Sequence, residues 1–74
     1  MSDGIWISAR AIRECKNLHQ AAVLSLIEKE KYVDFSRMRK KLRLSDDQLS
    51  SAILALEEMG KIETVNDEWK ETEK

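Results

Sequence analysis

The chain has 74 residues, of which 42% are hydrophobic and 36% are charged, with two glycines and no proline. A chain of this length forms one small domain, and this composition is typical of a folded, helix-rich protein. The single cysteine, Cys15, excludes an intramolecular disulfide and a multi-cysteine zinc site. No apolar stretch approaches the ~18 residues of a membrane span, and no signal peptide is recognisable. We therefore expect an intracellular protein with no metal and no cofactor.

The charges are divided unevenly between the two halves of the chain. Residues 1–43 carry ten basic and five acidic side chains, a net charge of +5, whereas residues 44–74 carry three basic and nine acidic side chains, a net charge of −6. Such a division influences the choice of partner more than the fold. The basic half is suited to an anionic partner, and the acidic half is suited to a cationic one.

Two helices are predicted in the first part of the chain. Ser8 is placed to cap a short helix that ends near Cys15, and Asn17 with Gln20 forms a capping pair for a helix from Leu18 to Glu30. An apolar stripe along the longer helix is expected to face the core, and it comprises Leu18, Ala22, Val23, Leu26 and Ile27. Leu24 points away from that stripe, so either the N-terminal segment covers it or it is exposed, as single leucines often are.

A short extended stretch, residues 32–35, separates the long helix from a basic one. We expect Ser36 to cap this basic helix, with Met38 and Leu42 facing inward. The outward side of the helix and the turn after it are almost wholly basic, and comprise Arg37, Arg39, Lys40, Lys41 and Arg43.

The third long helix has clear signals at both ends. Ser45 and Gln48 form a capping box, Asp46 and Asp47 lie in the first turn, where the helix dipole favours negative charge, and Gly60 ends the helix. Its inward stripe comprises Leu49, Ala52, Ile53, Leu56 and Met59.

After Gly60 the hydrophobic period changes from that of a helix to that of a strand. Residues 62–65 and 68–71 flank Asn66-Asp67, a pair suited to a two-residue hairpin turn. In this register Thr64 lies opposite Trp69. Glu63 likewise lies opposite Lys70. The expected fold class is mainly α with a small β-hairpin, an α+β domain.

This order of elements resembles the winged helix-turn-helix family, with a tight turn at residues 43–45 and a junction at residues 57–62 that leads from helix to wing. The resemblance implies three core helices and a C-terminal wing in residues 18–74, preceded by an N-terminal extension in residues 1–17. A narrower likeness, carried by residues 23–27, 35–42 and 62–72, is to the C-terminal winged helix of the middle subunit of replication protein A, which implies binding of a partner's short helix.

The first functional interpretation is a DNA-binding protein that regulates transcription. In a winged helix that binds DNA, the third core helix enters the major groove, where Gln48, Ser50 and Ser51 would face the bases. The basic second helix would lie along the backbone of double-stranded DNA, and its candidate phosphate contacts are Arg37, Arg39, Lys40, Lys41 and Arg43. Asp46 and Asp47 favour the helix dipole but not phosphate.

The second interpretation is a protein-interaction module. The third helix and the wing are acidic, so a basic amphipathic helix from a partner could lie along them. The candidate contacts are Glu63, Asp67, Glu68 and Trp69.

The remaining features of the sequence give no sign of catalysis. There is no glycine-rich phosphate loop, no Ser/His/Asp arrangement and no His/Cys cluster, so we do not expect an enzyme. His19 is expected on the surface, and Cys15 is expected to act as a small hydrophobic residue. Trp6 either packs against the first long helix or contributes to a homodimer through the N-terminal segment.

Overall fold

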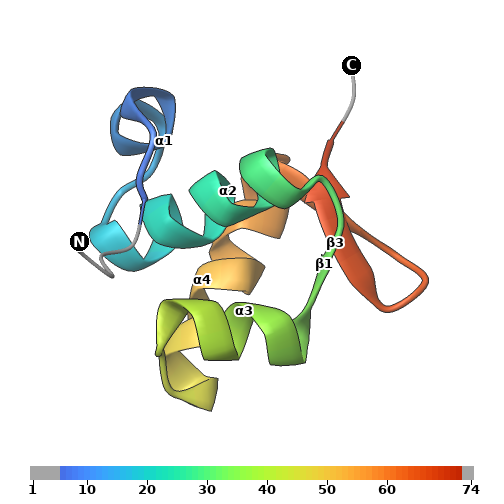
Figure 1. Ribbon diagram of the computed structural model, residues 1–74. Coiled ribbons are helices and arrows are strands. Elements are labelled where there is room, and N and C mark those ends of the chain that lie inside the picture. The colour runs from blue at the N-terminus through green and yellow to red at the C-terminus, as the bar shows by residue number, and fades with distance from the viewer. Residues whose placement is uncertain (1–5, 73–74) are drawn as a thin grey trace.

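The computed structural model describes residues 6–72 and shows an α+β arrangement of four helices and one three-stranded antiparallel sheet (Figure 1). The helix predicted over Leu18–Glu30 and the hairpin predicted around Asn66-Asp67 are confirmed. The elements in chain order are α1 (Ala9–Glu14), α2 (Leu18–Glu30), β1 (Val33–Asp34), α3 (Phe35–Leu42), α4 (Asp46–Glu58), β2 (Ile62–Val65) and β3 (Glu68–Glu71).

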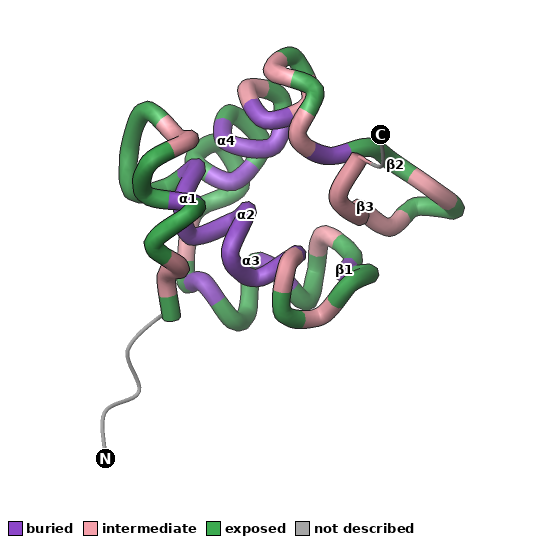
Figure 2. The backbone as a smooth tube through the Cα atoms, turned by 90° about the horizontal axis from the view of Figure 1, so that it is seen from above, coloured by how far each residue is buried: buried purple, intermediate pink, exposed green. Residues whose placement is uncertain are grey.

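Helix α2 lies at the centre of the molecule. In Figure 1, α1 lies above it, α3 and α4 lie below it, and the sheet lies beside its C-terminal end. The buried parts of the chain gather on α2 and on the sides of the other helices that face it (Figure 2). Every residue from Gln20 to Ile27 is buried. The core is therefore built around α2 rather than between two layers.

Three of the four helix caps predicted from serine and asparagine are confirmed. Ser8, Asn17 and Ser45 each accept a hydrogen bond from the backbone N–H three residues later, at the starts of α1, α2 and α4. At α4 the box is complete, because the Gln48 side chain also accepts from the backbone N–H of Ser45 at 3.1 Å. These bonds satisfy N–H groups that have no partner within a helix.

The cap predicted for the basic helix was wrong by two residues. Asp34, not Ser36, is the cap, because its carboxylate accepts from the backbone N–H of Arg37 at 2.7 Å and α3 begins at Phe35. A carboxylate at this place also suits the positive end of the helix dipole. The extended stretch is accordingly shortened to Val33 and Asp34.

The inward stripe predicted for α2 was wrong at its first residue. Leu18 is 68% exposed. Leu24, expected to need a second cover, is fully buried. On α4 the predicted stripe is buried except for Met59, which is half-buried against the core.

Strand β3 lies between β1 and β2 in the sheet. The predicted register is confirmed, with Thr64 opposite Trp69 and Glu63 opposite Lys70. Asn66 and Asp67 both have positive φ angles, 52° and 65°, as a two-residue turn of this twist requires. The pairing of β1 with β3 was not predicted, because a two-residue strand carries no periodicity.

The N-terminal segment is joined to the rest of the chain by buried and charged contacts. Ala11 is fully buried in the common core, and the Ser8 backbone N–H donates to the buried hydroxyl of Ser25 at 2.9 Å. Arg10 lies 3.0 Å from the carboxylate of Glu71 on β3. Arg10 also bonds Glu14, whose second partner, the ammonium group of Lys61, is the main reason that the pKa of Glu14 is lowered. Ala11 and Ser8 thus join the N-terminal segment to the same core as α2.

The contrast between Leu24 and Leu18 predicts very different effects of the same substitution. Leu24→Ala should lower the free energy of unfolding by about 2–5 kcal/mol, because it leaves a cavity in the core. Leu18→Ala should change it by no more than about 0.5 kcal/mol, because this side chain is already in solvent. Urea denaturation of both variants, followed by circular dichroism, tests this. Equal losses would contradict the burial of Leu24 and the exposure of Leu18.

Candidate nucleic-acid interface

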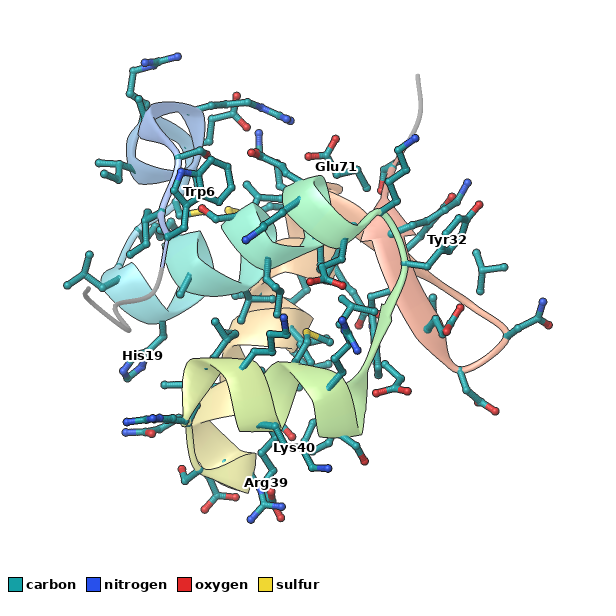
Figure 3. All side chains as sticks on the ribbon, viewed as in Figure 1. Trp6, His19, Tyr32, Arg39, Lys40 and Glu71 are labelled. Atoms are coloured by element: carbon teal, nitrogen blue, oxygen red, sulfur yellow. The ribbon has the colours of Figure 1, made fainter. Side chains whose placement is uncertain are left out.

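Helix α3 carries four cations and no carboxylate, and its two buried residues set the directions of these cations. Met38 and Leu42 are buried, so a helical period of 3.6 places Lys40 on the opposite side, pointing outward. Figure 3 shows Lys40 and Arg39 at the lower edge of the molecule. The other cations flank this outward direction on its two sides.

On one flank, Arg37 and Lys41 lie one turn apart and both reach Glu30, the last residue of α2. The Arg37 Nε lies 2.9 Å and the Lys41 Nζ 3.4 Å from the two Glu30 carboxylate oxygens. The hydrogen bond from Arg37 is the main cause that holds the pKa of Glu30 below its ordinary value, and Lys41 adds to it. A carboxylate at the C-terminal end of a helix is unfavourable for the dipole, and these two cations compensate for it.

On the other flank, Arg39 reaches the start of α4. Its Nε lies 2.7 Å from the Asp46 carboxylate, and both side chains are more than half exposed. Exposed ion pairs of this kind contribute only about 0–1 kcal/mol, so a phosphate can replace the carboxylate at little cost. In the isolated protein, Asp46 therefore neutralises the charge of Arg39 without preventing Arg39 from binding another anion.

Within residues 6–72, Lys40 and Arg43 form no ion pair. Arg43 ends α3 in the left-handed conformation, with φ 57° and ψ 37°, and so directs the chain into α4. This backbone conformation favours glycine, so Arg43 is retained at a conformational cost. The α3–α4 turn therefore carries a cation that the backbone geometry does not require.

At the start of α4, two of the predicted base contacts line a hollow of about 270 Å³ against the first turn of α2. Gln48 and Ser51 lie on the α4 side, and Asn17 and His19 lie on the α2 side. The Gln48 carbonyl oxygen is used in the capping box, which leaves the amide NH₂ as the free donor. Ser50 is exposed on α4 but does not line this hollow.

Sequence reasoning missed three residues of this region. Asn17 and His19 are about thirty positions from Gln48 in the chain, so only the packing of α2 on α4 brings them together. Leu54 is 58% exposed on the outward face of α4, three and four residues after Ser51 and Ser50. A signal for Leu54 was present, since it is a large apolar residue off the inward stripe.

The acidic hairpin holds its aromatic residue partly buried against the core. The Trp69 ring packs against the core and lies 6.5 Å from the ring of Phe35, and its indole N–H donates to Glu57 at 3.0 Å. Glu63 pairs across the hairpin with Lys70 at 3.4 Å, as the register predicts. Asp67 is exposed at the turn, and Glu68 is half-buried on β3.

No protein-family model, curated protein or solved structure matches this chain. Among residues 6–72, no helix is both long enough and apolar enough to cross a bilayer. In the same range, no group of three or more His, Cys, Asp or Glu side chains is placed to hold a metal ion.

The lowered pKa of Glu30 predicts how pH acts on the basic face. Folding lowers the pKa of the Glu30 carboxyl group from its ordinary value of 4.5. The group therefore stabilises the folded state at pH values above 4.5, and this stabilisation is lost as the pH falls through the pKa of the folded state. Arg37 and Lys41 should therefore be released from Glu30 only when the pH falls below the folded pKa of Glu30, which lies under 4.5. NMR of the Arg37 side-chain N–H during an acid titration follows this release.

Glu30→Gln should abolish the acid response of the Arg37 signal at constant fold. Glu58→Gln serves as the matched control, because Glu58 is an exposed carboxylate on α4 that forms no ion pair within the part of the chain that the structure describes. A response of Arg37 that persists in the Glu30 variant would contradict the assignment.

Proposed function

We propose that this chain is a winged helix that binds double-stranded DNA and acts as a transcription regulator rather than as an enzyme. The observation that supports the proposal best is the basic surface of α3 and its turn beside the polar first turns of α4. The order α2, α3, α4 and hairpin supports the winged helix, because the tight α3–α4 turn has the length of a helix-turn-helix connection.

In this proposal α3 lies along the phosphate backbone. Lys40 and Arg43 contact phosphates directly, since neither is engaged by a carboxylate of the described chain. Arg37, Arg39 and Lys41 exchange Glu30 and Asp46 for phosphate oxygens. Neutralising phosphates releases condensed counterions, so affinity falls with salt. If all five cations contact phosphate, the logarithm of the affinity falls with the logarithm of salt concentration with a slope of about −4 to −5.

The first turns of α4 enter the major groove. Ser50 and Ser51 present hydroxyl groups to base edges, and the free amide donors of Gln48 face an acceptor. Asp47, which is acidic and exposed, is suited to the amino group of cytosine. Leu54 continues the same face by one turn and suits contact with a thymine methyl group.

The negative charge of the C-terminal half orients the molecule on DNA. The hairpin lies at the end of α3 away from the α3–α4 turn (Figure 1), so repulsion of its carboxylates from phosphate favours approach of the turn. The alternative, in which a partner helix lies on the wing, has less support. Its proposed anchor, Trp69, already packs against Phe35 and donates to Glu57.

Two cations at positions with positive φ angles allow a matched test of the DNA interface. Arg43 and Lys31 both have positive φ angles, 57° and 72°, so glycine fits both positions while removing one charge. Arg43→Gly should reduce the salt slope by about 0.9 and weaken binding to all sequences alike. Lys31→Gly, at the far end of α2, should leave both unchanged. Fluorescence anisotropy with a mixed-sequence duplex between ~50 and ~200 mM salt measures the slopes.

An NMR titration with the same duplex locates the contact. Amide shifts confined to residues 37–51 that disappear as salt rises are expected. Binding without salt dependence, or an equal effect of the two glycine variants, would overturn the DNA proposal. Shifts confined to residues 63–69 would instead move the contact to the wing.

A further inference from the structure

A second hollow, separate from α3, lies where α1 meets the first turn of α2. It has a volume of about 250 Å³ and is lined by Ile12, Cys15, Lys16, Asn17, Leu18 and Ala21. Ile12 and Leu18 are 57% and 68% exposed, and neither belongs to the core. Two large aliphatic side chains therefore border one hollow and remain in solvent.

The size of this hollow limits what it can hold. Pockets for separate small molecules usually measure ~300–1,000 Å³ and bury most of the ligand. A smaller hollow with aliphatic borders is suited instead to one apolar side chain that projects from a partner. An exposed leucine alone is ordinary, but a pair that shares a hollow marks a docking surface when the charge around it is also one-sided.

The charge around this hollow is positive. Lys16 lines it, and Arg13 is its neighbour on α1. Both are exposed, and neither forms an ion pair with another residue of the range 6–72. The nearest carboxylate in the chain, Glu14, is already bound to Arg10 and Lys61. A symmetric contact with a second copy would bring Arg13 and Lys16 close to their own equivalents, which is unfavourable.

We infer that the α1–α2 hollow binds an acidic amphipathic helix of a partner protein, which inserts a leucine between Ile12 and Leu18 and places carboxylates beside Arg13 and Lys16. Recognition by an apolar anchor with a charged border is the usual mode for a helix in a groove. This inference goes beyond DNA binding and does not depend on it, because it uses none of the α3 cations.

The probe is a synthetic helical peptide with leucines at positions i, i+3 and i+7 and glutamates beside them. Calorimetry without DNA should show binding of this peptide and not of the same peptide with lysine for glutamate. Leu18→Ala should weaken binding about tenfold or more. Leu54→Ala is the matched control, because this leucine is similarly exposed on α4, and it should leave the affinity unchanged.

Charge reversal tests the positive border separately. Lys16→Glu should weaken binding of the acidic peptide and strengthen binding of the lysine peptide. Lys29 is an exposed lysine near the other end of α2, so Lys29→Glu should change neither affinity. Cys15 lines the hollow, so bound peptide should also slow its alkylation by iodoacetamide.

Three outcomes would overturn the inference. They are failure of the acidic peptide to bind, equal binding of the two peptides, or equal effects of Leu18→Ala and Leu54→Ala. Sedimentation equilibrium adds a fourth, since a dimer of the protein alone that Leu18→Ala abolishes would assign the hollow to a second copy. None of these measurements contains DNA, so their result is distinct from that of the DNA titration.

Discussion

Eight consecutive residues of α2, from Gln20 to Ile27, are buried, so this helix must be covered on every side by a chain of only 74 residues. The small size leaves few elements for the purpose, and each covers one side. Helix α1 covers one side, α3 and α4 cover the opposite side, and β3 lies beside the C-terminal end (Figure 1). Because small domains bury a limited share of their surface, losing one cover exposes a large part of the core.

This arrangement also separates the charges of the protein. Helix α3 turns Met38, Leu42 and part of Phe35 toward the core, so its four cations face solvent and form a basic surface. Glu30 and Asp46, at the adjoining ends of α2 and α4, lie within reach of those cations because the core holds the helices together. Ion pairs of this exposed type add little stability. They lower the charge of the free protein and leave the cations available to an anionic partner.

Two surfaces beside α2 have different chemistry. The surface proposed for DNA combines cations with small polar side chains and has one exposed apolar residue, Leu54. The hollow between α1 and α2 combines aliphatic side chains with two cations. Asn17 lies at the border of both hollows, because it caps the helix that separates them. A partner on one surface would therefore lie close to a ligand on the other without using the same contacts.

The sequence alone determined the local structure, because caps, helical period and turn residues act over a few positions. Asn17, Ser45, Gly60 and the Asn66-Asp67 turn indicated the bounds of α2, α4 and the hairpin. Only the tertiary structure decided that Leu18 is exposed, that His19 faces the start of α4 and that Trp69 is held by Glu57. Each of these depends on contacts between elements distant in the chain, and such contacts leave no periodic pattern in the sequence.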